Sequence, residues 1–323
     1  MAFRKVKKTK IGGKFLVYGY SGTGKSFFGC TFPKVAAIDS ETGLGFYEGE
    51  DLEIAGKTYN NLVSVDTTAN LDDLEEDLDA INEGEMEGIE TLLIDSETKM
   101  YNTMDIACSE VVEKNAKLNG KSVDTRTKWG MVKNINTKLR QAKISASAQG
   151  FHVVSTAQAK DIMGGKDKQE VIGHTYDAHK SLKFDYDIVL YFYTEKDKIT
   201  KEVKHMAIVE KDRTRTFNEG DILENPTYDL WKPYFDKRNG LEVNGANFTK
   251  DLKNSTTTVL TDSEKSDELA KELKSIILKN KDNKEFSNKA KELFKEEDIS
   301  PARLSEATPE QLKKIKSELD KLL

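Results

Sequence analysis

The chain has few cysteines and no long hydrophobic run. Cys30 and Cys108 are the only cysteines among its 323 residues, and so few thiols indicate unpaired cysteines in a reducing compartment. No apolar stretch approaches the roughly 18 residues that cross a bilayer, so no membrane partner is expected. The basic residues within positions 1–10 are not followed by an apolar stretch of signal-peptide character. We therefore expect a cytoplasmic protein.

The chain also lacks a positive net charge. Its 50 lysines and arginines are outnumbered by 56 aspartates and glutamates, which gives a net charge of −6. A nucleic acid would therefore have to be held by local basic loops, because the field of the whole molecule does not attract it. Composition alone neither requires DNA nor excludes it.

The length predicts one α/β domain of roughly 200 to 250 residues and a smaller module. Short β-rich runs alternate with helical patterns such as 71–81 and 132–144, as in parallel strands joined by crossover helices. The expected core is a doubly wound, mainly parallel sheet. The expected strands are 14–18, 35–39, 62–66, 90–95, 151–156 and 187–193, with a small hairpin at 51–61 and a further β-rich pair centred on 198–199 and 203–209.

The amino-acid composition of the chain changes near residue 240. Residues 239–262 are polar and contain two Asn-Gly pairs and a Ser/Thr run, which predicts a flexible linker after a core of residues 1–238. Residues 263–323 contain amphipathic stretches, and Thr308-Pro309-Glu310-Gln311 is typical of a helix start. These residues are expected to form a small all-α module.

A glycine-rich loop lies between a short apolar strand and a helical stretch. It matches the pattern Gly-x4-Gly-Lys-Ser, whose backbone N–H groups surround phosphates. Lys25 would contact the β- and γ-phosphates, and Ser26 would bind Mg²⁺. The residues expected to contact the nucleotide are Gly19, Tyr20, Ser21, Gly22, Thr23, Gly24, Lys25, Ser26 and Phe27.

Two further strand ends carry carboxylates. The run Thr91-Leu92-Leu93-Ile94-Asp95 is an apolar strand that ends in an acid, so Asp95 is the Walker B candidate and a second group for the metal. The strand at 35–39 leads into Glu41, which is the candidate base for the attacking water. Glu97, two residues after Asp95, is the alternative base.

In this order the motifs resemble the RecA-like ATPases, and among them the phage recombinases of the Sak type, which anneal single strands. The resemblance covers about residues 12–235 and rests on the P-loop, the 39–41 and 95–96 strand ends, and the run 153–158. It implies ATP and Mg²⁺ as cofactors and Gln158 as a sensor of the γ-phosphate. The helix between Lys25 and Pro33 is very short for RecA itself, which favours the minimal phage relatives.

Two segments are candidate DNA-binding loops. The segment 159–168 follows Gln158, has no apolar periodicity and carries Lys160, Lys166 and Lys168. The segment 117–129 carries Lys121, Arg126, Lys128 and the aromatic Trp129. Lysines on such loops could contact the phosphates of a single strand, and Trp129 is expected to pack at the start of the following helix rather than on a base. For both segments a plain solvated loop is the competing interpretation.

The resemblance also implies an oligomer with ATP at the subunit interfaces. RecA-like ATPases complete each site with a basic residue from the neighbouring subunit, and Lys211 and Arg213 are the best-placed candidates here. The leading hypothesis is therefore an ATP-dependent recombinase that assembles on single-stranded DNA in the cytoplasm of a phage-infected cell. Two alternatives stay open: a hexameric helicase or helicase loader, and a nucleotide-switched scaffold. The helical module could dock a single-strand-binding protein.

Overall fold

The computed structural model describes residues 5–54, 56–165, 170–199, 201–280 and 283–322. The chain divides into two compact units, Met1–Thr249 and Lys250–Leu323. Each unit has its own hydrophobic core, and the smaller core is made of residues from positions 269–319. We therefore describe the two units separately.

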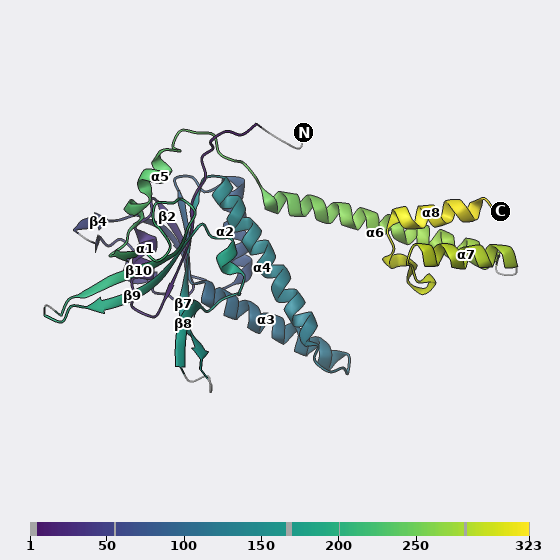
Figure 1. Ribbon diagram of the computed structural model, residues 1–323, viewed down its shortest axis with the longest axis horizontal. Coiled ribbons are helices and arrows are strands. Elements are labelled where there is room, and N and C mark those ends of the chain that lie inside the picture. Colours follow the sequence, from purple (N-terminus) through teal and green to yellow (C-terminus); the bar gives the residue numbers. More distant parts are fainter. Residues whose placement is uncertain (1–4, 55, 166–169, 200, 281–282, 323) are drawn as a thin grey trace. The chain divides into compact units, whose positions relative to one another are not determined.

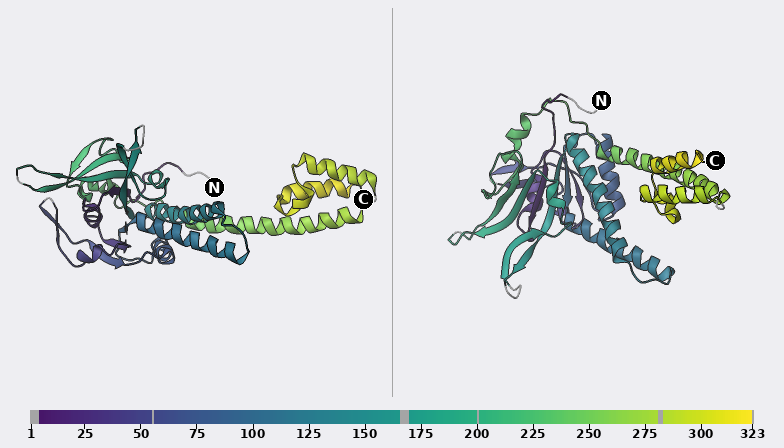
Figure 2. Two further views of the ribbon diagram at one scale, coloured as in Figure 1. Left: turned by 90° about the horizontal axis from the view of Figure 1, so that it is seen from below. Right: turned by 45° about the vertical axis from the view of Figure 1, so that its right-hand side comes forward.

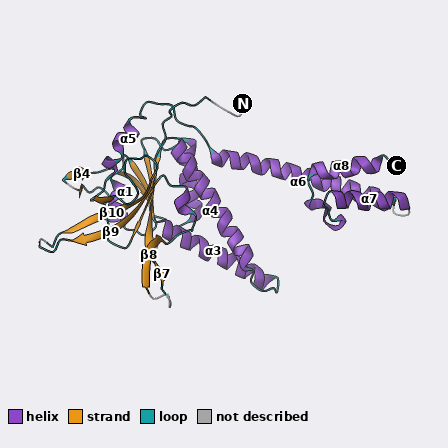
Figure 3. Ribbon diagram, viewed as in Figure 1, coloured by secondary structure: helices purple, strands orange, loops and turns teal. Residues whose placement is uncertain are grey.

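The larger unit is built on one twisted sheet (Figure 3). Its strand order is β11-β10-β9-β1-β7-β6-β2-β5, and β8 pairs with β7. The strands from β9 to β5 in this order are parallel to one another, whereas β10 pairs in antiparallel fashion with both β9 and β11. The expected mainly parallel fold is confirmed. The bounds are β1 Lys14–Gly19, β2 Val35–Asp39, β5 Leu62–Asp66, β6 Thr91–Asp95, β7 His152–Gly164, β8 Glu170–Tyr176, β9 Ile188–Lys196, β10 Val203–Asp212 and β11 Ile222–Glu224.

Helices cover both faces of the sheet, as Figure 2 shows. On one face, the helices α2 (Leu71–Glu83), α3 (Glu97–Leu118) and α4 (Thr125–Ala148) share a core with residues of β6 and β7. On the other face, α1 (Lys25–Cys30) and α5 (Lys232–Asp236) pack in a core that is rich in aromatic rings. Both faces of β2 and β6 are therefore buried, which explains their nearly continuous apolar sequence.

The 22-residue helix α3 is not among the expected elements. Its buried positions recur every four residues and are filled partly by small or weakly apolar side chains, so its apolar stripe is narrow. These positions are Met100, Met104, Cys108, Val112 and Ala116. A helix of this kind is recognised only when the sheet that it covers is known.

Two hairpins extend beyond the body of the sheet (Figure 1). In one of them β7 continues past Gln158 and pairs with β8 from Ala159 to Gly164. The expected basic loop at 159–168 is thus wrong for 159–164, which form a strand; Lys166 and Lys168 lie outside the described residues. In the other hairpin β9 pairs with β10, and Lys198 and Ile199 lie at the turn rather than in a strand. The small hairpin at 51–61 is confirmed as β3 (Leu52–Ile54) and β4 (Lys57–Tyr59).

The expected linker at 239–262 is wrong over most of its length. Helix α6 spans Phe248–Lys279, and the two units meet at Thr249 instead of near residue 240. The Ser/Thr run that predicted a linker donates its hydroxyl hydrogens to carbonyls one helical turn earlier, for example from Thr256 to Leu252 and from Thr258 to Asn254. Such bonds satisfy the polar side chains inside a helix.

The smaller unit is helical, as expected. Helices α7 (Lys284–Glu296) and α8 (Pro309–Asp320) pack with the end of α6 around Leu273, Phe286 and Leu312. The predicted capping box is present, because the Thr308 side chain accepts from the Gln311 backbone and the Gln311 side chain accepts from the Thr308 backbone. This reciprocal pair satisfies two of the free N–H groups at the helix start.

One buried histidine lies at the start of β7. The Nδ1 atom of His152 accepts a hydrogen bond from the Gly13 backbone at 3.0 Å, so its Nε2 carries the proton and faces the Tyr228 hydroxyl at 3.1 Å. Aromatic rings, including Phe15 and Phe235, surround the imidazole. Burial, with a smaller effect from Lys10, lowers the pKa of His152 to about 3.

We predict that His152 makes the larger unit sensitive to acid. Above pH 6.5 the imidazole is neutral in the folded and unfolded states; as the pH falls from 6.5 towards 3, only the unfolded state takes up the proton, so stability falls. The free energy of unfolding of His152→Asn should therefore fall less steeply between pH 7 and pH 4 than that of the wild type. Urea unfolding at several pH values measures both slopes, and equal slopes would contradict the assignment.

Candidate nucleotide-binding site

The P-loop connects the end of β1 to the start of α1. Gly22 and Gly24 have positive φ angles of 74° and 95°, which glycine adopts without strain. Gly24 is also the residue directly before α1, so the backbone turns sharply there and presents its N–H groups. The loop therefore has the conformation that the motif requires, between the expected strand and the expected helix.

Lys25 lies across the loop. Its Nζ atom donates a hydrogen bond to the Tyr20 carbonyl at 2.8 Å. Burial lowers the pKa of Lys25, while the negative charges of Asp95 and Glu41 act in the opposite direction. The lysine is thus close to both predicted carboxylates, and an incoming phosphate could replace the carbonyl as the partner of its ammonium group.

Ser26 and Asp95 contact each other. The Ser26 hydroxyl donates to the Asp95 carboxylate at 2.6 Å, and the Thr156 hydroxyl donates to its other oxygen. Burial raises the pKa of Asp95, and these two hydrogen bonds oppose that shift. In the part of the chain that the structure describes, no group of three or more His, Cys, Asp or Glu side chains could hold a metal. One hydroxyl and one carboxylate fit Mg²⁺, which takes its other oxygens from phosphates and water.

Glu41 is held in place by its own loop and by residues of two neighbouring segments, Ser96 after β6 and Gln158 in β7. The Asp39 carboxylate accepts hydrogen bonds from the backbone N–H groups of Glu41 and Leu44, at 3.0 and 2.8 Å, and so fixes the loop. One Glu41 oxygen accepts from the Ser96 hydroxyl at 2.7 Å and from the Gln158 amide at 3.0 Å. The predicted base and the predicted sensor therefore form a direct contact.

The alternative base, Glu97, belongs to a buried network. Its Oε1 atom forms an ion pair with Lys143 and accepts from the Ser155 and Tyr186 hydroxyls, at 2.7 and 3.1 Å. The side chains of Glu97 and Lys143 are only 10% and 7% exposed. A carboxylate that is already bonded to an ammonium group and two hydroxyls does not suit a general base, so the geometry favours Glu41.

Strand register explains why these groups meet. Gly19 lies opposite Gln158 in the pairing of β1 with β7, and Asp39 lies opposite Asp95 in the pairing of β2 with β6. Gly19, Asp39 and Asp95 end their strands, and Gln158 is the last residue of β7 that pairs with β1, so all four lie at the carboxyl edge of the parallel sheet, where open α/β sheets bind ligands. Ser96 and Thr156 also belong to the site, although neither was predicted to have a role. In the sequence, the one indication of such a role is a hydroxyl side chain close to a motif residue.

The remaining predicted residues lie apart from this cluster. Lys160, on β7, forms an ion pair with Asp177 at 2.8 Å, and Lys128 forms one with Asp105 at 2.9 Å. Lys121 is exposed between α3 and α4, whereas Arg126 and Lys128 lie in the first turn of α4, so the expected loop at 117–129 is wrong except for 119–124. Trp129 lies at the start of α4 as expected, but it is 49% exposed, and the Lys128 ammonium lies over its ring. Lys211 and Arg213 are at the end of β10.

The fold and the P-loop cluster define a P-loop nucleotide-binding protein with a mainly parallel α/β core. The chain belongs to the AAA domain family, whose family model matches residues 11–221. Membership of this P-loop ATPase family implies nucleotide binding. No curated protein matches the chain.

Solved structures with a similar fold include a KaiC-like protein from the hyperthermophilic archaeon Pyrococcus horikoshii and the RadB recombinase. Each is 14% identical with a TM-score of 0.37; the matches cover 67% of this chain and 85% and 87% of those chains. Neither likeness is close enough to indicate function. Among the described residues, no helix combines the length and apolar character needed to span a bilayer.

We predict that the two candidate bases, Glu41 and Glu97, respond differently to loss of their charge. Glu97→Gln leaves the buried Lys143 ammonium without its counter-charge and should lower the free energy of unfolding by about 3–5 kcal/mol. Glu41→Gln, at an exposed position, should cost less than about 1 kcal/mol. Chemical denaturation measures both values. A stable but hydrolytically inactive Glu97→Gln together with an active Glu41→Gln would reverse the assignment.

Proposed function

We propose that this protein is an ATP-dependent phage DNA recombinase that assembles on single-stranded DNA and promotes annealing. The observation that carries the proposal is the position of Gln158. It contacts Glu41 in the nucleotide site and lies on β7, which continues directly into the projecting β7–β8 hairpin. One strand thus joins the γ-phosphate region to a surface that DNA can reach.

The site suits hydrolysis of ATP. The P-loop amides and Lys25 would bind the phosphates, and Glu41 would accept the proton of the attacking water. Mg²⁺, when bound, would neutralise charge on the β- and γ-phosphate oxygens, and Ser26 and Asp95 are the residues placed to hold it. The contacts of Asp39 and Ser96 keep Glu41 in a fixed position before the substrate arrives.

A second contact links the P-loop to the hairpin. The Tyr20 hydroxyl donates to Asp161 of β7 and lies 3.3 Å from Nδ1 of His174 on β8. The hydrogen bond to Asp161 raises the pKa of Tyr20 to about 12, so the hydroxyl remains protonated. The Tyr20 carbonyl also accepts the hydrogen bond from Lys25. If the lysine bonded to a phosphate instead, Tyr20 would lose this contact, and its hydroxyl is the group that bonds to the hairpin.

The candidate DNA contacts are charged groups with replaceable partners. The ion pair of Lys160 with Asp177 is about half exposed, and exposed pairs contribute little to stability. A DNA phosphate could therefore take the place of the carboxylate. Lys121, Arg126, Lys128 and the half-exposed Trp129 are the second set of candidate contacts, in which the aromatic ring could stack on a base.

The position of Lys211 and Arg213 supports a head-to-tail oligomer. Lys211 lies opposite Val189, near the start of β9, and Arg213 pairs with Asp187 at 3.1 Å. This is the amino-terminal edge of the parallel strands, whereas the P-loop follows their carboxyl ends. The two edges are roughly 17 Å apart over the six residues of β1. Only a neighbouring copy could bring these residues to a P-loop, and repetition of that contact produces a ring or a filament.

Both donors have partners that they could exchange. Lys211 donates to the carbonyls of Lys183 and Tyr186, and the Arg213 side chain is 60% exposed. We also propose that the smaller unit docks a single-strand-binding protein. It folds around its own hydrophobic core, so it can act as a separate module.

The first test is the response of hydrolysis to DNA. We expect ATP hydrolysis to require Mg²⁺, to rise when single-stranded DNA is added and to be lost in Lys25→Ala. Lys160→Ala should weaken DNA binding and reduce the slope of log affinity against log salt by about 1, because one phosphate contact is lost. Lys232→Ala, on the distant α5, is the matched control and should change neither. Hydrolysis that is indifferent to DNA would remove the main support for the proposal.

The second test is complementation between subunits. Lys25→Ala and Arg213→Ala should each be inactive alone, yet a mixture should regain activity, because about a quarter of the interfaces then pair an intact P-loop with an intact Arg213. A mixture of Lys25→Ala with Glu41→Gln is the control and should stay inactive, since both defects affect the same side of the interface. Electron microscopy of the ATP-bound protein would separate a filament from the closed ring of a helicase.

A further inference from the structure

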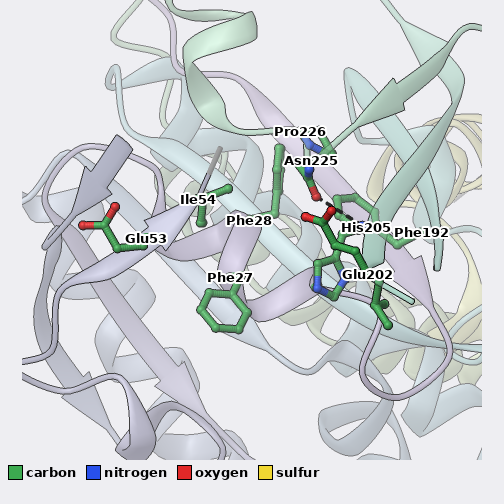
Figure 4. Close-up of a pocket in the computed structure, with 11 residues that line it drawn as sticks. Phe27, Phe28, Glu53, Ile54, Phe192, Glu202, His205, Asn225 and Pro226 are labelled. Carbon is green, nitrogen blue, oxygen red and sulfur yellow. Dashed lines mark hydrogen bonds between the residues drawn. The ribbon is translucent and has the colours of Figure 1, made fainter. Parts of the chain in front are cut away.

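A small pocket lies directly beside the P-loop (Figure 4). It has a volume of about 180 Å³, and its lining residues include Gly24, Phe27, Ile54, Phe192, His205 and Asn225. Binding sites for whole drug-sized ligands usually measure roughly 300–1,000 Å³. The pocket therefore suits one part of a nucleotide and not the whole molecule.

His205 supplies an unused polar group in this pocket. Its Nδ1 atom is buried and has no hydrogen-bond partner among the described residues. The imidazole also lies against the P-loop, because a Cβ atom on Gly24 would come within 3.0 Å of Nδ1. Because this atom is enclosed, a ligand in the pocket reaches the imidazole through the part of the ring that lines the pocket, since the residue as a whole is only partly buried.

Asn225 holds His205 in position. The Asn225 Oδ1 atom accepts from the His205 backbone N–H at 3.1 Å, and the Asn225 backbone N–H donates to the His205 carbonyl at 2.6 Å. These bonds fix the start of β10 through both backbone groups of His205. The imidazole is therefore presented by a rigid strand and not by a free loop.

The charges and walls of the pocket indicate what it binds. Glu53 and Glu202 are also among its lining residues, and their carboxylates would repel a second phosphate. Phe27, Phe192 and Ile54 provide flat or apolar surface. An uncharged heteroaromatic ring with polar edges fits this combination, because its faces contact the apolar walls and one edge can bond to His205.

We propose that this pocket binds the nucleobase of the triphosphate whose phosphates lie in the P-loop. The inference rests on the proposed nucleotide binding and adds the base-recognition residues. His205 forms the hydrogen bond to the base edge, and Phe27, one turn from the phosphate loop, packs against the base. Asn225 is a positioning residue that acts through His205.

The test compares two ligands on the full-length protein. Calorimetric titrations use a non-hydrolysable ATP analogue and inorganic tripolyphosphate, both with Mg²⁺. His205→Ala should weaken binding of the ATP analogue about tenfold and leave tripolyphosphate binding unchanged. His179→Ala, a histidine outside both sites, is the matched control and should alter neither affinity. Ile54→Trp fills the pocket and should have the same selective effect without removing a polar group.

The outcomes separate this inference from the proposed function. If His205→Ala and Ile54→Trp leave the affinity for the ATP analogue unchanged, or weaken both ligands equally, the pocket is not a base site, although nucleotide binding by the P-loop stands. If the wild type binds neither ligand, the proposed function and this inference both fall. Selective loss of the ATP analogue in both variants supports the assignment.

Discussion

The candidate site depends on the parallel register of four central strands. Because β2, β6, β7 and β1 run in the same direction, they deliver Asp39, Asp95, Gln158 and Gly19 to one edge of the sheet. None of these residues needs a long flexible loop to reach the others. Hydrogen bonds link neighbouring strands at this edge, from Thr156 to Asp95 and from Gln158 to Glu41, and the buried strands behind them keep these residues in place.

Asp95 and Glu97 show how environment separates two acids in one stretch of chain. Asp95 ends β6 and faces the hydroxyls of Ser26 and Thr156, so it remains at the metal side of the site. Glu97 is the first residue of α3, and it forms an ion pair with the buried ammonium group of Lys143 on α4. A buried ion pair of this kind is costly to break, which makes Glu97 a structural group. The exposed Glu41 is the carboxylate that a water molecule could approach.

The P-loop has contacts on three sides, and each side serves a different purpose. Ser26 leads to the metal position, Gly24 borders the small pocket around His205, and Tyr20 reaches the β7–β8 hairpin. Since β7 also carries Gln158, the hairpin has two connections to the phosphate region. This arrangement gives a physical route by which the nucleotide state could alter the hairpin, and it requires only small side-chain movements.

The parts of this protein that rest on local chemistry could be predicted from adjacent residues. The P-loop glycines, the apolar strands that end in Asp39 and Asp95, and the capping box at Thr308 are all short patterns whose geometry follows from adjacent residues. The mainly parallel core followed from the alternation of such strands with helical stretches.

Features that need partners distant in sequence could not be predicted, because they depend on how the chain packs. Packing assigned Glu97 to Lys143, paired residues 159–164 with β8, brought His205 to Gly24, and turned the Ser/Thr run of the expected linker into part of α6. Local sequence is ambiguous in these places, because a polar residue can face water or a buried partner. The packing of the rest of the chain decides which environment it meets.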